Sequence, residues 1–286
     1  MIPTQDPPLP GGDAGATAAL VERLFREVYN GQAFDLAEQL FADDYVNHQP
    51  GAAPGISGLR QWASTMLTMF PDLTGTIEHM VVQNDRAMVF VAWHGHMAGT
   101  GKELNSQTAN LYRVRDGRIA EHWSVFDYSA LVPFGITPPD QEQPASEPDW
   151  HASPAEQENL RLVLKVWEEV MQKQNLDYAD EHYRADYIQH NRFAAQSGGG
   201  LAGMKQFFAG LFVAAPDLTG TIDHILVQDD FVALFSRWRG REATSGRELK
   251  LHTADLLRIE DGRIAEHWDV FDYSAVAQFG IIPPPR

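Results

Sequence analysis

Apolar residues recur at helical spacing at the start of each half of the chain. Their spacing of three and four residues is that of a helix that turns one face to a core. The runs are Leu20, Leu24, Phe25 and Val28 in the first half and Val163, Val166, Trp167 and Val170 in the second. Two further helices are predicted in each half, at residues 34–41 and 59–70 and at 176–182 and 201–214. Pro71 and Pro216 end the third helix because proline cannot continue one.

Strand-like runs follow the helices and predict four strands in each half. In the first half they cover residues 75–83, 87–97, 106–115 and 118–128, and matching runs occur in the second. Three helices followed by a four-stranded antiparallel sheet form a two-layer α+β pattern. A strongly curved sheet wrapped on helices leaves a conical cavity between the layers, and we expect the functional site there.

The two halves are copies of one unit. The run PDLTGTI begins at Pro71 and again at Pro216, and DGRIAEHW begins at Asp116 and at Asp261, an offset of 145 residues in both cases. The copies span about residues 16–138 and 157–284. We expect residues 1–15 to be a disordered tail and the proline-rich, charged residues 139–156 to be an extended linker.

Composition narrows the class of partner. The 286 residues are 44% hydrophobic, which suits two globular cores, and the formal net charge of −17 argues against a nucleic-acid groove. A neutral or weakly polar small molecule is the expected partner. There is no cysteine, so catalysis would use carboxylate, imidazole, hydroxyl or guanidinium groups. With no signal-peptide pattern and no apolar run near ~18 residues, we expect a cytoplasmic protein without membrane contact.

Several separated motifs resemble the SnoaL-like polyketide cyclase family, also labelled ester cyclases, within the NTF2-like superfamily. They are YIQHN at residues 187–191, FPD or APD after the third helix, and RxxDGRIxEHWD at residues 258–269. The resemblance covers both copies and implies cone-shaped domains that act without a cofactor. It also implies that Asp269 is the general acid/base of an intramolecular aldol closure. Copy one has Ser124 there, and the family's site histidine falls on Asp255 in copy two and on Asn110 in copy one.

The residues themselves suggest a pair of carboxylates. Asp255 and Asp269 are separated by an even number of residues, so they share a sheet face if the hairpin loop between them has an odd number. A three-residue loop with Gly262 in the left-handed region would satisfy this and would also place His267 and Phe271 on the same face. Two carboxylates in an apolar pocket raise one pKa by repulsion and desolvation, which suits proton transfer at neutral pH. Asp269 could equally be a rim residue with ordinary hydrogen bonds.

Other candidates line the expected pocket of copy two or its counterpart in copy one. Phe207 and Leu211 would form apolar walls. Two histidines, His48 and His190, resemble the family's pocket-rim histidine, although they could simply cap a loop. Arg239 could hold a substrate carboxylate, pair with an acid or meet solvent. His122 recurs as His267, so both could serve the fold instead of a reaction.

Copy one is either a diverged second site, with Asn110, Ser124 and His122 in the pocket, or a structural half. Its His94 and His96 have metal-ligand spacing, but copy two carries arginines at both positions, and we expect no metal site.

Three functions are compatible with this pattern. The first is a cofactor-independent cyclase or isomerase that acts on a small carbonyl compound, mainly in copy two. The second is a hydrolase of the limonene epoxide hydrolase type, in which Asp255, Asp269 and Arg239 would activate water. The third is a non-catalytic small-molecule-binding protein. Single domains of the family commonly pair through their sheets, so the chain would be a monomer with an internal pseudo-dimer or a homodimer.

Overall fold

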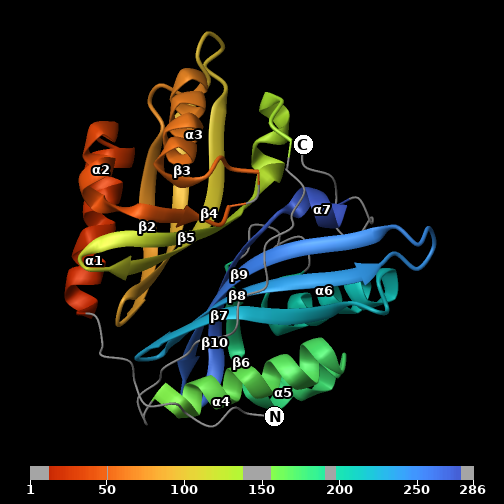
Figure 1. Cartoon of the computed structure of the whole chain (residues 1–286). Helices are drawn as coiled ribbons and strands as arrows, with labels where there is room; N and C mark the ends of the chain where they lie inside the picture. Colours follow the sequence, from red (N-terminus) through yellow and green to blue (C-terminus); the bar gives the residue numbers. More distant parts are fainter. Residues whose placement is uncertain (1–12, 50, 138–155, 191–197, 278–286) are drawn as a thin grey trace.

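The computed structural model describes residues 13–49, 51–137, 156–190 and 198–277. It contains two domains with the same order of elements, drawn in red to yellow-green and in green to blue in Figure 1. Each has helices on one face of a five-stranded sheet. Residues 1–12 and most of the predicted linker lie outside the described residues.

Domain 1 places its longer helices before its second strand and two short 3-10 helices after its last strand. Its helical elements are α1 (Ala14–Arg23), continued by the π-helical η1 (Leu24–Tyr29), then η2 (Phe34–Leu36), α2 (Ala37–Leu40), α3 (Gly55–Met69), η3 (Tyr128–Ala130) and η4 (Val132–Phe134). Its strands are β1 (Phe41–Asn47), β2 (Thr74–Gln83), β3 (Arg86–His96), β4 (Glu103–Arg115) and β5 (Arg118–Phe126), in the spatial order β1-β5-β4-β3-β2.

Domain 2 repeats this arrangement. Its helical elements are α4 (Glu156–Val166), η5 (Trp167–Gln172), η6 (Leu176–Tyr178), α5 (Ala179–His182), α6 (Gly200–Ala214) and α7 (Tyr273–Ala277). Its strands are β6 (Tyr183–Gln189), β7 (Thr219–Gln228), β8 (Phe231–Arg241), β9 (Glu248–Glu260) and β10 (Arg263–Phe271), in the order β6-β10-β9-β8-β7.

The α+β class and the two tandem domains are confirmed, but the count of four strands is wrong. A fifth strand, β1 or β6, runs parallel to the last strand of each sheet, so both sheets are mixed. This strand was missed because FADDYVN and YRADYIQ carry central charges, and aspartate is unfavourable in strands. Only Tyr45 and Tyr187 and the residues at the start of each strand are buried.

The helices of each domain cover the inner face of its sheet and close an apolar core. In domain 1, Leu24, Phe25 and Val28 are buried, as the helical spacing predicts. In domain 2, Val163, Val166 and Val170 have the same role, with Trp167 packed against the cluster. The core-facing stripe of the first helix was therefore predicted correctly in both copies.

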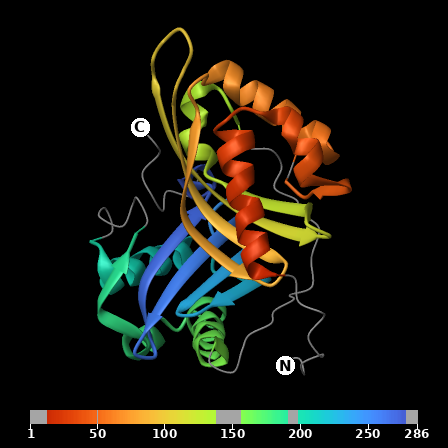
Figure 2. The same cartoon turned by 90° about the vertical axis from the view of Figure 1, so that its left-hand side faces the viewer.

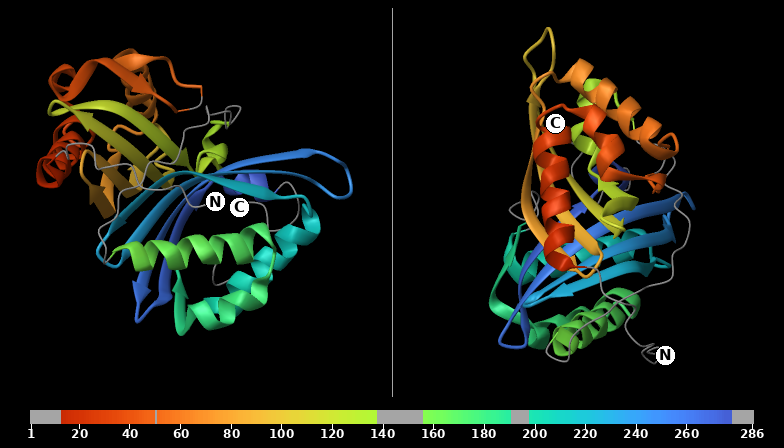
Figure 3. Two further views of the ribbon diagram at one scale, coloured as in Figure 1. Left: turned by 60° about the horizontal axis from the view of Figure 1, so that its bottom comes forward. Right: turned by 60° about the vertical axis from the view of Figure 1, so that its left-hand side comes forward.

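The outer faces of the two sheets pack against each other and form a third apolar core. It combines Val81, Met88, Phe90, Ala109, Leu111, Trp123 and Val125 with Leu226, Ala233, Phe235, Ala254, Leu256 and Val270. Figure 3 shows the sheets facing each other, with α1 and α4 on the outer sides of the pair. The long strands of the two sheets run at an angle to each other where they meet (Figure 2).

Equivalent residues make reciprocal contacts across this junction. Gln228 Oε1 accepts a hydrogen bond from the Val82 amide at 2.7 Å, and Gln83 Nε2 donates to the Val227 carbonyl at 3.1 Å. Both pairs are related by the 145-residue offset. The two domains are therefore related by an approximate twofold axis.

Candidate active site

Domain 2 contains a cavity, open to solvent, between α6 and the inner face of its sheet, and about 840 Å³ of empty space lies in it and at its mouth. Most of its wall is apolar. Phe207 and Leu211 come from α6, whereas Trp238 and Phe271 come from the sheet. The polar residues that line it are Gln189, Thr253, Asp255, His267, Asp269 and Tyr273. The predicted walls and the predicted carboxylate pair thus meet in one cavity.

The two carboxylates share a face for a different reason from the one expected. The hairpin between β9 and β10 has a two-residue turn, Asp261 and Gly262, both with positive φ. The additional residue that restores the register is a bulge at Ala265, between the Ile264 and Glu266 pairs. A two-residue turn plus a bulge therefore has the same effect as the predicted three-residue loop. Asp255 and Asp269 lie directly opposite each other on adjacent strands.

A chain of hydrogen bonds connects the two carboxylates through an imidazole and an amide. His267 Nε2 lies 3.0 Å from Asp255 Oδ1, and His267 Nδ1 lies 2.8 Å from Gln189 Oε1. The Gln189 amide nitrogen donates to Asp269 Oδ2 at 2.8 Å. The cavity thus holds two acids and one base in contact, which is an arrangement suited to moving protons.

Both ring nitrogens of His267 lie within hydrogen-bond distance of oxygen atoms, an arrangement that favours the protonated imidazole. Burial lowers the pKa of His267, but the hydrogen bond with Asp255 and the negative charges of Asp269 and Asp255 outweigh it and raise the pKa above its usual value. The Gln189 orientation agrees, because its oxygen also accepts from the Tyr187 hydroxyl. The surroundings of His267 therefore favour the charged imidazole more than water does.

Further hydroxyl groups hold the two carboxylates in place. Thr253 donates to Asp255 Oδ2 at 2.8 Å, and the Thr253 oxygen lies 2.7 Å from the Ser236 hydroxyl. The Tyr273 hydroxyl donates to Asp269 Oδ1 at 3.2 Å. Asp269 is half-buried, which leaves it open to a molecule in the cavity.

Two of these polar residues, Gln189 and Tyr273, were not predicted from the sequence. Gln189 belongs to the YIQHN run, in which the resemblance to the family pointed to His190 as the pocket residue. Neighbouring residues on a strand point to opposite faces, and the parallel pairing of β6 directs Gln189 into the cavity. Tyr273 lies in the repeated VFDYSA run. The same tyrosine recurs in copy one as Tyr128, and this repeat is a signal that could have indicated Tyr273 as a candidate.

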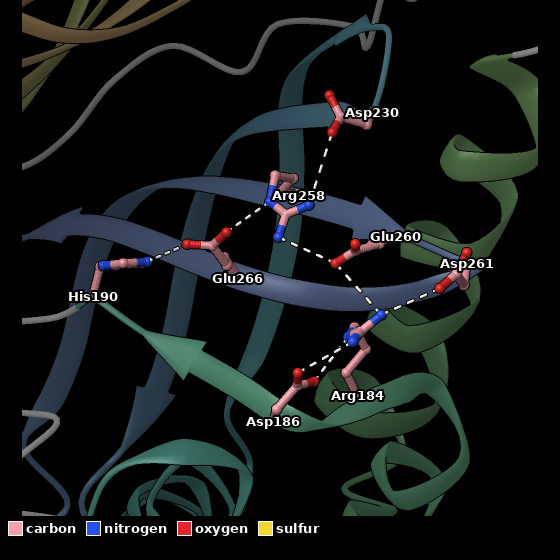
Figure 4. A network of polar contacts seen from close by, with 8 residues as sticks. All are labelled: Arg184, Asp186, His190, Asp230, Arg258, Glu260, Asp261 and Glu266. Atoms are coloured by element: carbon pink, nitrogen blue, oxygen red, sulfur yellow. Dashed lines mark hydrogen bonds and ion pairs between the residues drawn. The ribbon is translucent and has the colours of Figure 1, made fainter.

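His190 and His48 do not line the cavities. His190 stacks on Trp268 on the outer face, with ring centroids 4.3 Å apart, and its Nε2 lies 2.6 Å from Glu266. Figure 4 shows it at one end of an ionic network that continues through Glu266 to Arg258. His48 repeats this in domain 1, where it stacks on Trp123 and contacts Glu121. The prediction that His48 and His190 lie at the pocket rim was wrong. Each histidine comes one residue after the residue that faces the cavity, which is Asn47 in domain 1 and Gln189 in domain 2.

Arg239 also lies outside the cavity, contrary to the substrate-binding prediction. Its neighbour Trp238 lines the cavity, so Arg239 projects to the opposite face, where it is exposed. Arg237, on that same face, pairs with Asp223 at 2.6 Å. Among the residues that the structure describes, no arginine lines the domain 2 cavity. The set that the hydrolase alternative requires, Asp255, Asp269 and Arg239, is therefore not assembled in this cavity.

Domain 1 has a smaller pocket at the equivalent place, with about 360 Å³ of empty space in it and at its mouth, and the described residues that line it carry no carboxylate, lysine or arginine. His122 Nε2 lies 3.0 Å from Asn110 Oδ1, and its Nδ1 lies 3.3 Å from the Tyr45 hydroxyl. Burial, with a smaller effect from the charge of His48, lowers the pKa of His122 to about 3. Ser124 is buried opposite Asn110 but is not among the residues that line the cavity.

The other two histidines singled out in domain 1 lie on its surface. His96 Nδ1 contacts Asp72 at 2.7 Å, and His94 contacts Asn105. Across the four described ranges, no three histidine or acidic residues are grouped as metal ligands would be. No helix within these ranges has the length and apolar character needed to cross a bilayer.

The three helices on a curved five-stranded sheet, with a cavity between the layers, define each domain as an NTF2-like α+β cone. A family model described as SnoaL-like polyketide cyclase matches residues 19–133 and again residues 161–278. The chain therefore belongs to the SnoaL-like polyketide cyclase family and carries two tandem copies of its domain.

Several solved structures resemble one domain of this chain. TsrD from Streptomyces laurentii is 22% identical, with a TM-score of 0.39, over 42% of this chain and 95% of its own. IdmH from Streptomyces antibioticus, a candidate polyketide cyclase, is 28% identical with a TM-score of 0.37 over 42% and 99%. AclR from Streptomyces galilaeus, a candidate hydroxylase, is 19% identical with a TM-score of 0.40 over 44% and 100%. A search of curated proteins found no match.

Proposed function

We propose that domain 2 is an acid/base catalyst that removes a proton next to a carbonyl group of a small apolar substrate and returns it elsewhere. The chain Asp255–His267–Gln189–Asp269 inside an apolar cavity carries the proposal. Asp269 is the catalytic base because it faces the cavity and is half-buried. His267 and Asp255 set the charge around it, and Gln189 positions it.

Asp269 begins the reaction as a carboxylate. It takes the proton from the substrate carbon, and the electron pair of that C–H bond moves onto the carbonyl oxygen to give an enolate. Protonated His267, the form that its raised pKa favours, stabilises the negative charge that develops in the low-dielectric cavity. The enolate then follows one of two routes. Its carbon attacks a second carbonyl of the same molecule, or the anion is protonated at a different carbon from the one that lost the proton. Asp269 returns its proton to the new alkoxide or carbon, which gives cyclisation or isomerisation respectively.

A hydrogen-exchange experiment tests this proton transfer without the natural substrate. Cyclic ketones and 1,3-dicarbonyl compounds are incubated with the full chain in D2O, and loss of the α-proton signal is followed by NMR. We expect exchange with wild type and a loss of about 10²- to 10⁴-fold in Asp269→Asn, the usual contribution of a positioned acid/base. Ser124→Ala, at the equivalent position of domain 1, is the matched control and should exchange as wild type does. Equal exchange in wild type and Asp269→Asn would refute the assignment.

We also propose that the chain acts as a monomer with an internal pseudo-dimer. The outer sheet faces that could pair two separate domains already cover each other, with Leu226 and Leu256 fully buried between them. Sedimentation velocity at micromolar concentration should give the mass of one 31.9 kDa chain. A species of twice that mass would contradict this proposal and leave the acid/base assignment untouched.

A further inference from the structure

The side-chain amide of Gln189 faces two members of the domain 2 hydrogen-bond chain with groups of opposite character. Its oxygen lies 2.8 Å from His267 Nδ1, and its nitrogen lies 2.8 Å from Asp269 Oδ2. An amide oxygen only accepts hydrogen bonds, whereas an amide NH2 group only donates them. In this orientation the amide therefore favours a proton on His267 Nδ1 and no proton on Asp269 Oδ2.

A reversed amide would satisfy the same two neighbours in the opposite protonation states. Its nitrogen would donate to an unprotonated His267 Nδ1, and its oxygen would accept from a protonated Asp269. His267 Nε2 would still donate to Asp255 Oδ1, which lies 3.0 Å away. The direction in which the amide faces therefore determines whether His267 or Asp269 holds a proton on the side next to Gln189.

The hydroxyl of Tyr187 selects one of these two orientations. Tyr187 is 4% exposed on β6, two residues before Gln189, and its hydroxyl donates to Gln189 Oε1. Within the described ranges, this oxygen is the one acceptor that the hydroxyl meets. Burial, with the nearby Tyr183 and the two carboxylates, holds the pKa of Tyr187 well above its usual value, so the phenol keeps its proton. Reversal of the amide would leave that buried proton without an acceptor, which is unfavourable.

Domain 1 lacks the intervening amide, and there the same tyrosine has the opposite effect. Tyr45, the equivalent of Tyr187, has its hydroxyl 3.3 Å from His122 Nδ1. Asn47 replaces Gln189, and its side-chain oxygen accepts a backbone N–H of the next turn. A hydroxyl that donates directly to an imidazole nitrogen favours the neutral ring, whereas one that donates to an amide oxygen shared with the ring favours the protonated ring.

Three strands and one helix bring ionisable groups to this hydrogen-bond chain. They are Asp255 on β9, Asp269 on β10, Tyr183 and Tyr187 on β6 and Tyr273 on α7. Helix α6 contributes no titratable side chain to the described part of the cavity wall. Burial raises the pKa of both β6 phenols, so the charges that act on His267 at neutral pH are those of the two aspartates.

We propose that Tyr187 is a positioning residue of the domain 2 site, which acts through the orientation of Gln189 to keep His267 protonated and Asp269 ionised. Tyr187 does not line the cavity, so it affects a bound molecule only through this amide. Its effect on the two protonation states follows from the hydrogen bonds alone. Its importance for proton abstraction rests on the proposed function.

An NMR titration of the His267 imidazole in the full chain tests the proposal without a substrate. The signal is assigned with His267→Gln. Tyr187→Phe removes only the hydroxyl and keeps the ring that packs on Tyr183, so this variant should fold as wild type does. We expect the pKa of His267 to fall by about half to one pH unit, the effect of one ordinary hydrogen bond.

Tyr45→Phe is the matched control, because it removes the equivalent hydroxyl from domain 1. It should leave the pKa of His267 unchanged and should raise the pKa of His122, since the hydroxyl there stabilises the neutral ring. The two variants are thus expected to shift the histidine of their own domain in opposite directions.

A further variant tests whether Tyr187 acts through the amide. Gln189→Leu removes both the acceptor and the donor, so it should lower the pKa of His267 by itself. In that background Tyr187→Phe should produce no additional shift. The exchange of α-protons in model ketones gives a second readout. The acidic limb of its pH profile, which reports the ionisation of Asp269, should move to higher pH in Tyr187→Phe and stay in place in Tyr45→Phe.

Three results would overturn the proposal. The first is a His267 pKa that Tyr187→Phe leaves unchanged or raises. The second is an equal effect of Tyr187→Phe in the wild-type and Gln189→Leu backgrounds, because the hydroxyl would then act by another route. The third is a fall in the pKa of His122 in Tyr45→Phe, because the amide would then not explain the difference between the domains. Equal exchange in wild type and Asp269→Asn would instead refute the proposed function and leave the titration results standing.

Discussion

Asn110 and Asp255 occupy equivalent positions in the two domains, and each accepts a hydrogen bond from the histidine of the next strand over the same distance of 3.0 Å. The two hydrogen bonds have the same geometry, but the acceptor is a neutral amide in domain 1 and a carboxyl group in domain 2. Burial with a neutral partner lowers the pKa of His122 to about 3. Burial also acts on His267, yet Asp255 and Asp269 raise its pKa above the usual value. The exchange of an amide for a carboxylate thus accompanies opposite shifts in the pKa of the two buried imidazoles.

Replacing Asp255 by asparagine should give His267 the behaviour of His122. We expect the pKa of His267 to fall, because burial is then opposed by the charge of Asp269 alone. An NMR titration of the imidazole signals measures this directly. Asn110→Asp is the reciprocal variant and should raise the pKa of His122. If His267 titrates identically in wild type and Asp255→Asn, the charge of Asp255 is not what keeps it protonated.

His122 should make domain 1 sensitive to acid. Its pKa is near 6.5 when unfolded and about 3 when folded, so the unfolded chain binds more protons between these values. Stability from this group is therefore present above about pH 6.5 and lost as the pH falls towards 3, by up to about 1.4 kcal/mol per pH unit. Urea unfolding at pH 7 and pH 4.5 measures the loss. His122→Gln keeps hydrogen-bonding groups without a titrating ring, and an undiminished pH dependence in it would contradict the prediction.

Asp272 should have the opposite pH dependence. Burial, aided by the charge of Asp127, raises its pKa to about 6, although the hydroxyl and amide of Ser274 act against this. The folded chain then binds more protons than the unfolded chain between about pH 4 and 6. Stability from this group is present below that window and lost as the pH rises through 6.

Asp272→Asn removes the buried charge and keeps the oxygen that caps Ser274. At pH 8 it should be more stable than wild type by about 2–3 kcal/mol, and this gain should disappear near pH 4. Chemical denaturation at the two pH values is the measurement. A variant less stable than wild type at pH 8 would show that the capping contact outweighs the buried charge.

The junction between the sheets should not tolerate a charge. Leu256 is fully buried there, so Leu256→Lys should lower the free energy of unfolding by about 3–5 kcal/mol. Val213→Lys, at a position with 78% exposure, should change it by less than about 0.5 kcal/mol. Denaturation and small-angle scattering of both variants test this. Equal stability of the two variants would mean that the outer sheet faces do not hold the domains together.

The repeated motifs and the helical spacing were sufficient to predict the fold class, the two copies and most of the core. The cavity carboxylates were also predicted, because alternation along a strand is a local property. The wrong predictions concern residues whose direction depends on how their strand pairs with its neighbour. The bulge at Ala265 and the parallel strand β6 depend on pairing with distant residues. A displacement of one residue moves a side chain to the other face, which is why His190 was chosen in place of Gln189.

Arg239 was misplaced for a related reason. An arginine in a strand is compatible with either face, and only the cavity position of Trp238 fixes its direction.

The junction between the domains also affects how the two halves can diverge. In an assembly of two identical chains, every substitution appears on both sides of the axis, so a catalytic acid is kept twice or lost twice. Here His79 packs on Trp268 and His224 on Trp123, contacts that match in kind but are encoded separately. In a single chain the two domains still support each other through equivalent contacts, but a substitution in one domain is not copied into the other. One cavity can therefore change while the other keeps its acids.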